Sequence, residues 1–171
     1  EAYAAIEQTA RLGGVEERGI ALSREIRDRV EATAARARAR PPVPALFCVQ
    51  LDPIVAAGAG TLPAEILELA GGRNVVTAAR YPRIGIESVL AYAPEAIIVA
   101  RMDAPDPAGP GRVLDYWKRW PSIPAVKSRR VHVIDASTAL RAGPRVAEAV
   151  ESLARLLHPE LRDPAPAGRR P

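Results

Sequence analysis

The sequence predicts an α/β fold, a Rossmann-like sandwich with a mainly parallel sheet, preceded by one long spanning helix. After Pro44, short apolar runs alternate with helical segments, as in βαβ proteins. Some runs, such as Ala96-Ile-Ile-Val-Ala, are apolar throughout, which is typical of parallel strands covered on both faces. An uninterrupted helical pattern runs from about Glu16 to Arg40 and is ended by Pro41-Pro42.

Two helices are expected before the sheet. The first covers Ala2 to Leu12 and is stopped by Gly13-Gly14. The second, of about 37 Å at 1.5 Å per residue, places one apolar stripe at Leu22, Ile26, Val30, Ala34 and Ala37. The last stripe residues are alanines, so the helix is not expected to be buried along its whole length. We expect a solvent-exposed helix that connects two lobes, a solvated strut, with a coiled-coil arm as the alternative.

After Pro44 the apolar runs predict the remaining elements. Strands are expected at 45–49, 96–100 and 131–134, and helices at 62–70, 88–93, 113–120 and 146–157. Thr61 is a typical helix cap, and Gly71-Gly72 ends that helix. The aromatic residues of the 113–120 helix have the spacing of a buried face. From Pro159 onward the sequence has no periodicity and predicts a loose tail.

The composition argues against some classes of function. The chain has 171 residues, enough for one core, with 48% hydrophobic and 26% charged residues. The net charge is +4, but no basic stripe with interleaved aromatics occurs, which argues against nucleic-acid binding. No apolar run reaches the ~20 residues of a membrane span. The single Cys48 lies in an apolar segment and is expected to be buried.

Catalytic groups are few. His132 and His158 are too far apart for a spaced metal motif, so we expect each to be structural. No nucleophile elbow, phosphate-binding P-loop or Cys-x-x-Cys motif is present. The Gly58-Ala-Gly60-Thr61 loop is compatible with an enzyme acting on a phosphorylated substrate or with a tight strand-to-helix turn. We expect no catalytic residue, catalytic cofactor or metal site.

Polar and aromatic residues instead gather in three loops, at 50–60, 74–86 and 135–145. In an open α/β sheet, the loops beyond the carboxyl ends of the strands form the ligand crevice. These loops are therefore the predicted binding region.

At these loops the sequence resembles the helical-backbone solute-binding proteins, the class III metal-chelate receptors of ABC importers, and most closely the periplasmic vitamin B12-binding proteins. The resemblance covers about residues 11 to 160. Its motifs are Asp52-Pro53 with Ala57-Gly58, Ala70-Gly-Gly-Arg-Asn74-Val, Tyr81-Pro-Arg-Ile-Gly-Ile-Glu87, Ala93-Pro-Glu-Ala-Ile-Ile98, Ile123-Pro-Ala-Val-Lys127, Val131-His-Val-Ile-Asp135 and Arg141-Ala-Gly-Pro-Arg145.

The resemblance implies two α/β lobes joined by one long helix. Residues 1–14 then correspond to the end of a missing N-terminal lobe, 15–41 to the interlobe helix, 42–160 to the C-terminal ligand-binding lobe and 161–171 to a disordered tail. It also implies a protein that is not an enzyme and that delivers cobalamin to an ABC permease. Haem or a ferric siderophore is the alternative ligand.

The resemblance also suggests roles for individual residues. Tyr81 matches an aromatic residue that packs on the corrin ring, and Arg141 matches a ligand-side arginine. Val55 stands where the B12 binders offer a larger aromatic. Glu87 matches the glutamate that docks on permease arginines; a favourable charge at a helix start is the alternative role for it.

The expected partners and location follow from the same resemblance. The chain is expected to be a monomer without a transmembrane segment, periplasmic or otherwise extracytoplasmic, with or without a lipid anchor. An interaction module built on the long helix is the remaining alternative, and it predicts self-association.

Overall fold

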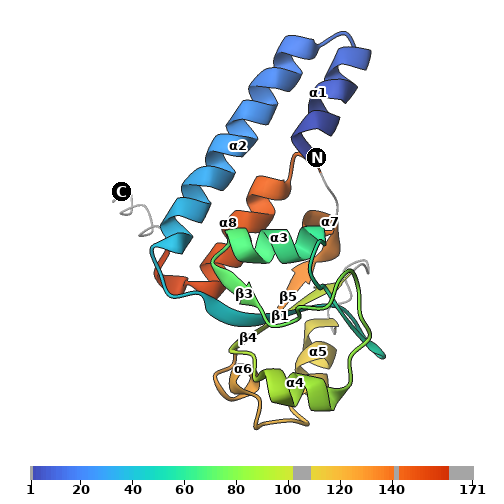
Figure 1. Cartoon of the computed structure of the whole chain (residues 1–171), viewed down its shortest axis with the longest axis vertical. Helices are drawn as coiled ribbons and strands as arrows, with labels where there is room; N and C mark the ends of the chain where they lie inside the picture. The colour runs from blue at the N-terminus through green and yellow to red at the C-terminus, as the bar shows by residue number, and fades with distance from the viewer. Residues whose placement is uncertain (1, 102–108, 141–142, 162–171) are drawn as a thin grey trace, which may run out of the picture.

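A helical hairpin and a layered α/β body make up the molecule, and one helix runs from the first into the second (Figure 1). The computed structural model describes residues 2–101, 109–140 and 143–161. It confirms the predicted α/β class, the mainly parallel sheet and the long preceding helix.

The hairpin consists of α1 (Ala2–Leu12) and α2 (Glu16–Arg38). In the turn between them Gly14 has a φ of 70°, which glycine adopts without a steric cost. The helices approach most closely at Gly19, where a Cβ atom would collide with the side chain of Ala10. The glycine therefore permits this close approach.

The predicted apolar stripe of α2 contains one error. The stripe residues that are buried are Ile26, Val30, Ala34 and Ala37. Leu22, in contrast, is 39% exposed, and Gly19 and Ser23 are buried in that half of the helix. Since α1 packs closely on this half, small side chains face it and the larger leucine points elsewhere.

The second half of α2 packs on α8 (Val146–Leu157). Ile26 shares a hydrophobic cluster with Val150 of α8. Beside this cluster Arg29 donates two hydrogen bonds of 3.0 Å to the carboxylate of Glu151, and this pairing raises the pKa of Arg29. The expectation of a solvated strut is therefore wrong for this half of the helix.

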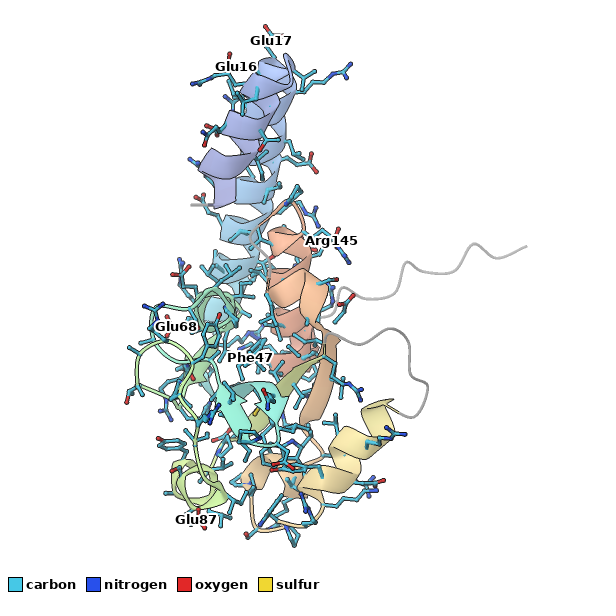
Figure 2. The ribbon with its side chains drawn as sticks, turned by 90° about the vertical axis from the view of Figure 1, so that its right-hand side faces the viewer. Glu16, Glu17, Phe47, Glu68, Glu87 and Arg145 are labelled. Carbon is cyan, nitrogen blue, oxygen red and sulfur yellow. The ribbon has the colours of Figure 1, made fainter. Side chains whose placement is uncertain are left out.

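The sheet contains β1 (Val43–Leu51), β2 (Ile54–Ala56), β3 (Gly72–Asn74), β4 (Ala96–Arg101) and β5 (Val131–Asp135). Strands β1, β4 and β5 are adjacent in that order and parallel. On the other edge of β1, its first residues pair with β3 in parallel and its last residues pair with β2 antiparallel. The carboxyl ends of β1, β4 and β5 thus share one edge, on the right of Figure 1 and toward the viewer in Figure 2.

Helices cover both faces of the sheet (Figure 1). One face carries α2, α3 (Leu62–Leu69), α7 (Ala136–Ala139) and α8; the other carries α4 (Ile86–Tyr92), α5 (Gly109–Trp117) and α6 (Pro124–Lys127). Along β1, Phe47 belongs to the first hydrophobic cluster and Leu46 and Cys48 to the second. A strand buried on both faces has no polar side, which explains the uniformly apolar runs.

Several predicted bounds are confirmed, among them 146–157 for α8 and the Thr61 cap, whose Oγ1 accepts a hydrogen bond from the N–H of Ala64. The 113–120 helix ends earlier, at Trp117, which is fully buried as its spacing predicts.

The predicted loose tail begins too early. Pro159–Leu161 forms a 3-10 helix, and Leu161 is only 8% exposed, because it packs on the apolar cluster between α2 and α8. Residues 162–171 lie outside the described residues.

Candidate functional site

A short ribbon, formed by residues 54–59 and 78–84, lies at the carboxyl edge of the sheet; we refer to it as the edge ribbon. It is antiparallel at Val55 and Arg83, whereas Ala59 and Ala79 form a parallel bridge at its other end. Backbone hydrogen bonds join its two sides: Ile84 N–H to Ile54 C=O (3.0 Å), Ala56 N–H to Pro82 C=O (3.0 Å), Gly58 N–H to Arg80 C=O (2.7 Å) and Arg80 N–H to Ala59 C=O (3.0 Å). A loop bonded so regularly to a sheet strand is held in one conformation.

Val55 and Arg83 face each other in the middle of the edge ribbon. The hydrogen bonds on either side of them join the neighbouring residues, so Val55 and Arg83 are a non-hydrogen-bonded pair. In such pairs the Cβ atoms are about 4.5–5.5 Å apart and both side chains project from the same face. Val55 is half-buried and Arg83 is exposed.

Side chains alternate along the ribbon. The inward side chains of Ile54, Ala56 and Ile84 pack in or against the second hydrophobic cluster. The opposite, outward face carries Val55, Arg83 and, two residues before Arg83, Tyr81, which is 49% exposed. By this alternation Tyr81 is assigned to the same face as Val55.

The residue before Tyr81 has an unusual backbone. Arg80 has a φ of 62°, a left-handed conformation that is uncommon for residues other than glycine. Both its N–H and its C=O are hydrogen-bonded across the ribbon, and these bonds hold the conformation. The turn that presents Tyr81 is therefore fixed by its neighbours.

Asn74 anchors the ribbon to the sheet. Its Nδ2 donates a hydrogen bond of 2.9 Å to the carbonyl of Ala57, and its Oδ1 accepts one of 3.1 Å from the N–H of Val76. The Asn74 side chain at the end of β3 thus joins one side of the ribbon to the segment that leads into the other side.

The Gly58–Thr61 segment is a packed turn. The N–H groups of Gly58 and Ala59 donate to the carbonyls of Arg80 and Ala78, and a Cβ at Gly58 would collide with the Ala78 carbonyl. These two N–H groups are already bonded within the chain, so they do not offer themselves to a phosphate, which favours the tight-turn alternative. Gly58 permits the close approach of the two backbones.

Glu87 lies in the first turn of α4 and is exposed. A Cβ atom at Gly85 would contact its carboxylate, so this group folds back over the helix N-terminus, where a negative charge is favourable. Figure 2 shows Glu87 at the end of the molecule opposite Glu16 and Glu17. Docking and helix stabilisation are both compatible with this position.

A groove of about 360 Å³ opens at the same carboxyl edge, between the ends of β1 and β4 and helix α5. Val49, Val99 and Tyr116 contribute to its walls, together with Arg101 and Arg112. Burial is the main cause of the raised pKa of Tyr116. The groove extends the apolar surface available at this edge.

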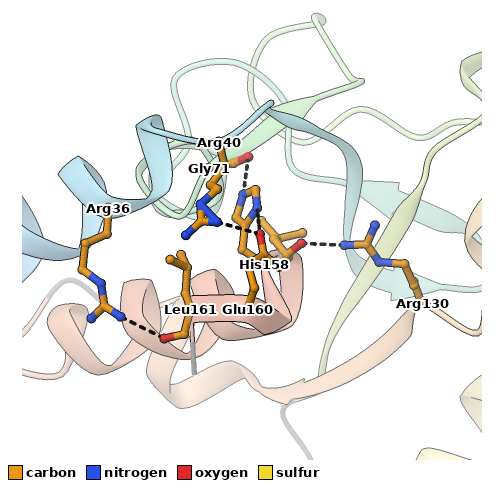
Figure 3. A network of polar contacts seen from close by, with 8 residues as sticks. Arg36, Arg40, Gly71, Arg130, His158, Glu160 and Leu161 are labelled. Carbon is orange, nitrogen blue, oxygen red and sulfur yellow. Dashed lines mark hydrogen bonds and ion pairs between the residues drawn. The ribbon is translucent and has the colours of Figure 1, made fainter. Parts of the chain in front are cut away.

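Neither histidine belongs to the edge ribbon, whereas Cys48 on β1 pairs with Ala56 of the ribbon. His158 is 3% exposed and its Nε2 lies 3.2 Å from the carbonyl oxygen of Gly71 (Figure 3), so its role is structural, as predicted. His132 lies in β5 and is half-buried. Cys48 is buried, and the loss of water raises the pKa of its thiol to about 12.

Arg141, predicted as a ligand-side residue, lies outside the described residues. Sequence reasoning passed over Arg83, although it stands in the motif that contains Tyr81. The missed signal is the alternation of Tyr81, Pro82, Arg83 and Ile84, which indicates a strand-like segment with an outward face.

In residues 2–101, 109–140 and 143–161, no three His, Cys, Asp or Glu side chains are grouped so that they could hold a metal ion. Within the same ranges, none of the helices combines the length and apolar character needed to cross a membrane.

Comparison with known proteins identifies the family. A family model described as periplasmic binding protein matches residues 1–138. The vitamin B12-binding protein of Vibrio parahaemolyticus is 26% identical over 148 residues, which are 85% of this chain and 51% of that protein. The chain thus spans about half the length of the curated relatives it matches.

Two solved structures share the fold. The periplasmic haem-binding protein from Roseiflexus in apo form has a TM-score of 0.80 at 23% identity, covering 92% of this chain and 62% of its own. A protein of an Fe3+-hydroxamate ABC transport system from Saccharomonospora viridis has a TM-score of 0.78 at 20% identity, covering 91% and 55%. With the family match over most of its length, the chain belongs to the periplasmic binding protein family, whose members are solute-binding proteins and not enzymes.

Proposed function

We infer that this chain forms a ligand-binding lobe of an ABC importer's solute receptor and that it binds a metal chelate at the outward face of the edge ribbon. The observation that carries this proposal is the exposed Tyr81, which lies two residues before Arg83, the cross-strand partner of half-buried Val55 on a hydrogen-bonded ribbon. The ribbon lies at the carboxyl edge of a parallel sheet, where open α/β sheets bind ligands.

A flat aromatic ring beside an aliphatic side chain suits a large, partly apolar macrocycle. Cobalamin is supported as the ligand by the B12-binding relative. Haem and ferric siderophores are supported by the haem-binding and hydroxamate-transport neighbours. We assign Tyr81 and Val55 to contact with the chelate and Arg141 to hydrogen bonding of its polar groups.

Delivery requires a second surface that meets the ABC permease. We assign this role to Glu87, whose exposed carboxylate lies on α4. The proposed location is the periplasm or another extracytoplasmic compartment, with or without a lipid anchor, as the family match supports.

The experiment is a titration of the purified chain with cyanocobalamin, with haemin and with a ferric hydroxamate siderophore, monitored by ligand absorbance. We expect binding without turnover, and weak binding, because one lobe buries one side of a ligand. Replacing Tyr81 by Ala is expected to weaken binding about tenfold through loss of ring stacking.

Tyr92→Ala is the matched control, since Tyr92 is 39% exposed but lies on α4. Equal losses in both variants would contradict a site at Tyr81. Failure of the unmodified chain to bind cyanocobalamin, haemin and a ferric hydroxamate siderophore at millimolar concentration would contradict the proposed function itself.

A further inference from the structure

The outward face of the edge ribbon also carries the cationic side chain of Arg83. The proposed contact of Tyr81 and Val55 with the chelate does not involve this side chain. Arg83 is the cross-strand neighbour of Val55 and lies two residues after Tyr81 on the same face. In an extended segment, residues two apart are about 6.6–7 Å apart along the chain. A macrocycle lying on Tyr81 and Val55 therefore has its rim within reach of the long Arg83 side chain.

Arg83 is available for a ligand. It is exposed, and its side chain makes no ion pair with any carboxylate in residues 2–101, 109–140 and 143–161. Arg29, in contrast, forms an ion pair with Glu151 at 3.0 Å. The backbone of Arg83 is fixed by the hydrogen bonds of Pro82 and Ile84 to β2, so the guanidinium extends from a rigid base.

A second positive charge, that of Arg80, lies near Arg83. Arg80, three residues earlier in the same segment, is also exposed and also makes no ion pair in the described part of the chain. The turn that presents Tyr81 therefore carries two positive charges with no counter-ion from the described residues. An anion brought to this turn would provide the missing charge.

We propose that Arg83 is a specificity-determining residue of the edge ribbon, and that it selects chelates with carboxylate groups at their rim. The guanidinium fork matches a carboxylate in a bidentate geometry, and charge-assisted hydrogen bonds are stronger than those to neutral amides. Haem carries two carboxylates, whereas the side groups of cobalamin are largely amides. This inference rests on the proposed function and names the ligand class within it.

The test compares haemin with its dimethyl ester, which keeps the iron and the ring but lacks the free carboxylates. Dissociation constants are measured by absorbance titration for the unmodified chain, for Arg83→Gln and for Arg24→Gln. Arg24 is an exposed arginine on α2, so its replacement removes the same charge elsewhere. Thermal unfolding confirms that each variant is folded.

We expect the unmodified chain to prefer haemin over the ester about tenfold, and Arg83→Gln to reduce this preference to near unity. Arg24→Gln should keep the preference, and added salt should weaken it. Equal preference in the unmodified chain and in Arg83→Gln overturns this inference and leaves the proposed function standing. Failure of the unmodified chain to bind haemin, the ester, cyanocobalamin and a ferric hydroxamate siderophore overturns both.

Discussion

At the scale of the residue, His132 combines burial with an unsatisfied polar atom. Within the described ranges, its Nε2 is buried without a hydrogen-bond partner. Burial lowers the pKa of His132, and the nearby Arg130 cation lowers it further. Both causes act against the charged imidazolium, so the folded chain favours the neutral ring.

Because of His132, the free energy of unfolding should fall at acidic pH. A histidine whose pKa is lower in the folded state binds its proton more readily when unfolded, so acid favours unfolding. The stability linked to His132 is complete above the unfolded value near 6.5 and is lost progressively as the pH falls below it. Urea unfolding between pH 7.5 and pH 5 should show this loss, and His132→Leu should reduce it. An unchanged pH slope in the variant would contradict the assignment.

Residues of the candidate site differ in how far the sequence reveals them. Tyr81 and Glu87 stand in a motif with a family resemblance, so the sequence alone is enough to select both. Arg83 cannot be selected in that way, because its position beside Val55 depends on a pairing between segments 28 residues apart, 83 minus 55. No local pattern fixes that register.

At the scale of the element, the base of α2 is joined to the body by a polar network (Figure 3). His158 Nδ1 lies 3.6 Å from Glu160, which also pairs with Arg40 at 3.4 Å. The other ring nitrogen of His158, Nε2, faces the carbonyl of Gly71 at 3.2 Å; since a carbonyl only accepts, Nε2 donates. The network thus connects α2, the turn before β3 and the end of α8.

His158→Ala should destabilise this joint. It removes a buried hydrogen bond and leaves a cavity beside Gly71, and we expect a loss of about 2–3 kcal/mol in the free energy of unfolding. Hydrogen exchange should rise at the amide of Val43, which donates to the same Gly71 carbonyl.

His158→Gln can keep one donor and serves as the conservative control. If His158→Ala and His158→Gln unfold at the same urea concentration as the unmodified chain, the network does not stabilise the joint.

Elements defined by local signals could be predicted, and elements defined by distant partners could not. Helix α8 has a full apolar period between clear ends, and α3 has the Thr61 cap. Strands β2 and β3 have three residues each, too few for a recognisable period. Each exists because β1 supplies its hydrogen bonds, which is tertiary information.

At the scale of the whole molecule, two surfaces serve two proposed purposes. The edge ribbon lies at the carboxyl edge of the sheet, whereas Glu87 lies on α4, whose apolar side packs through Val89 on the second hydrophobic cluster. Gly85 separates the edge ribbon, which ends at Ile84, from α4, which begins at Ile86. Because the carboxylate of Glu87 is exposed, its removal is not expected to disturb the outward face of the ribbon.

Docking by Glu87 can be separated from helix stabilisation with a second glutamate. Glu65 is also an exposed acidic residue in the first turn of a helix, α3, so any effect on the helix dipole, about 0.3–1 kcal/mol, applies to both. We expect Glu87→Ala to weaken binding of the chain to the reconstituted ABC permease at least tenfold, with chelate affinity unchanged. Glu65→Ala should bind the permease as the unmodified chain does. If both variants bind it equally well, α4 is not the docking surface, and the carboxylate of Glu87 serves only to stabilise its helix.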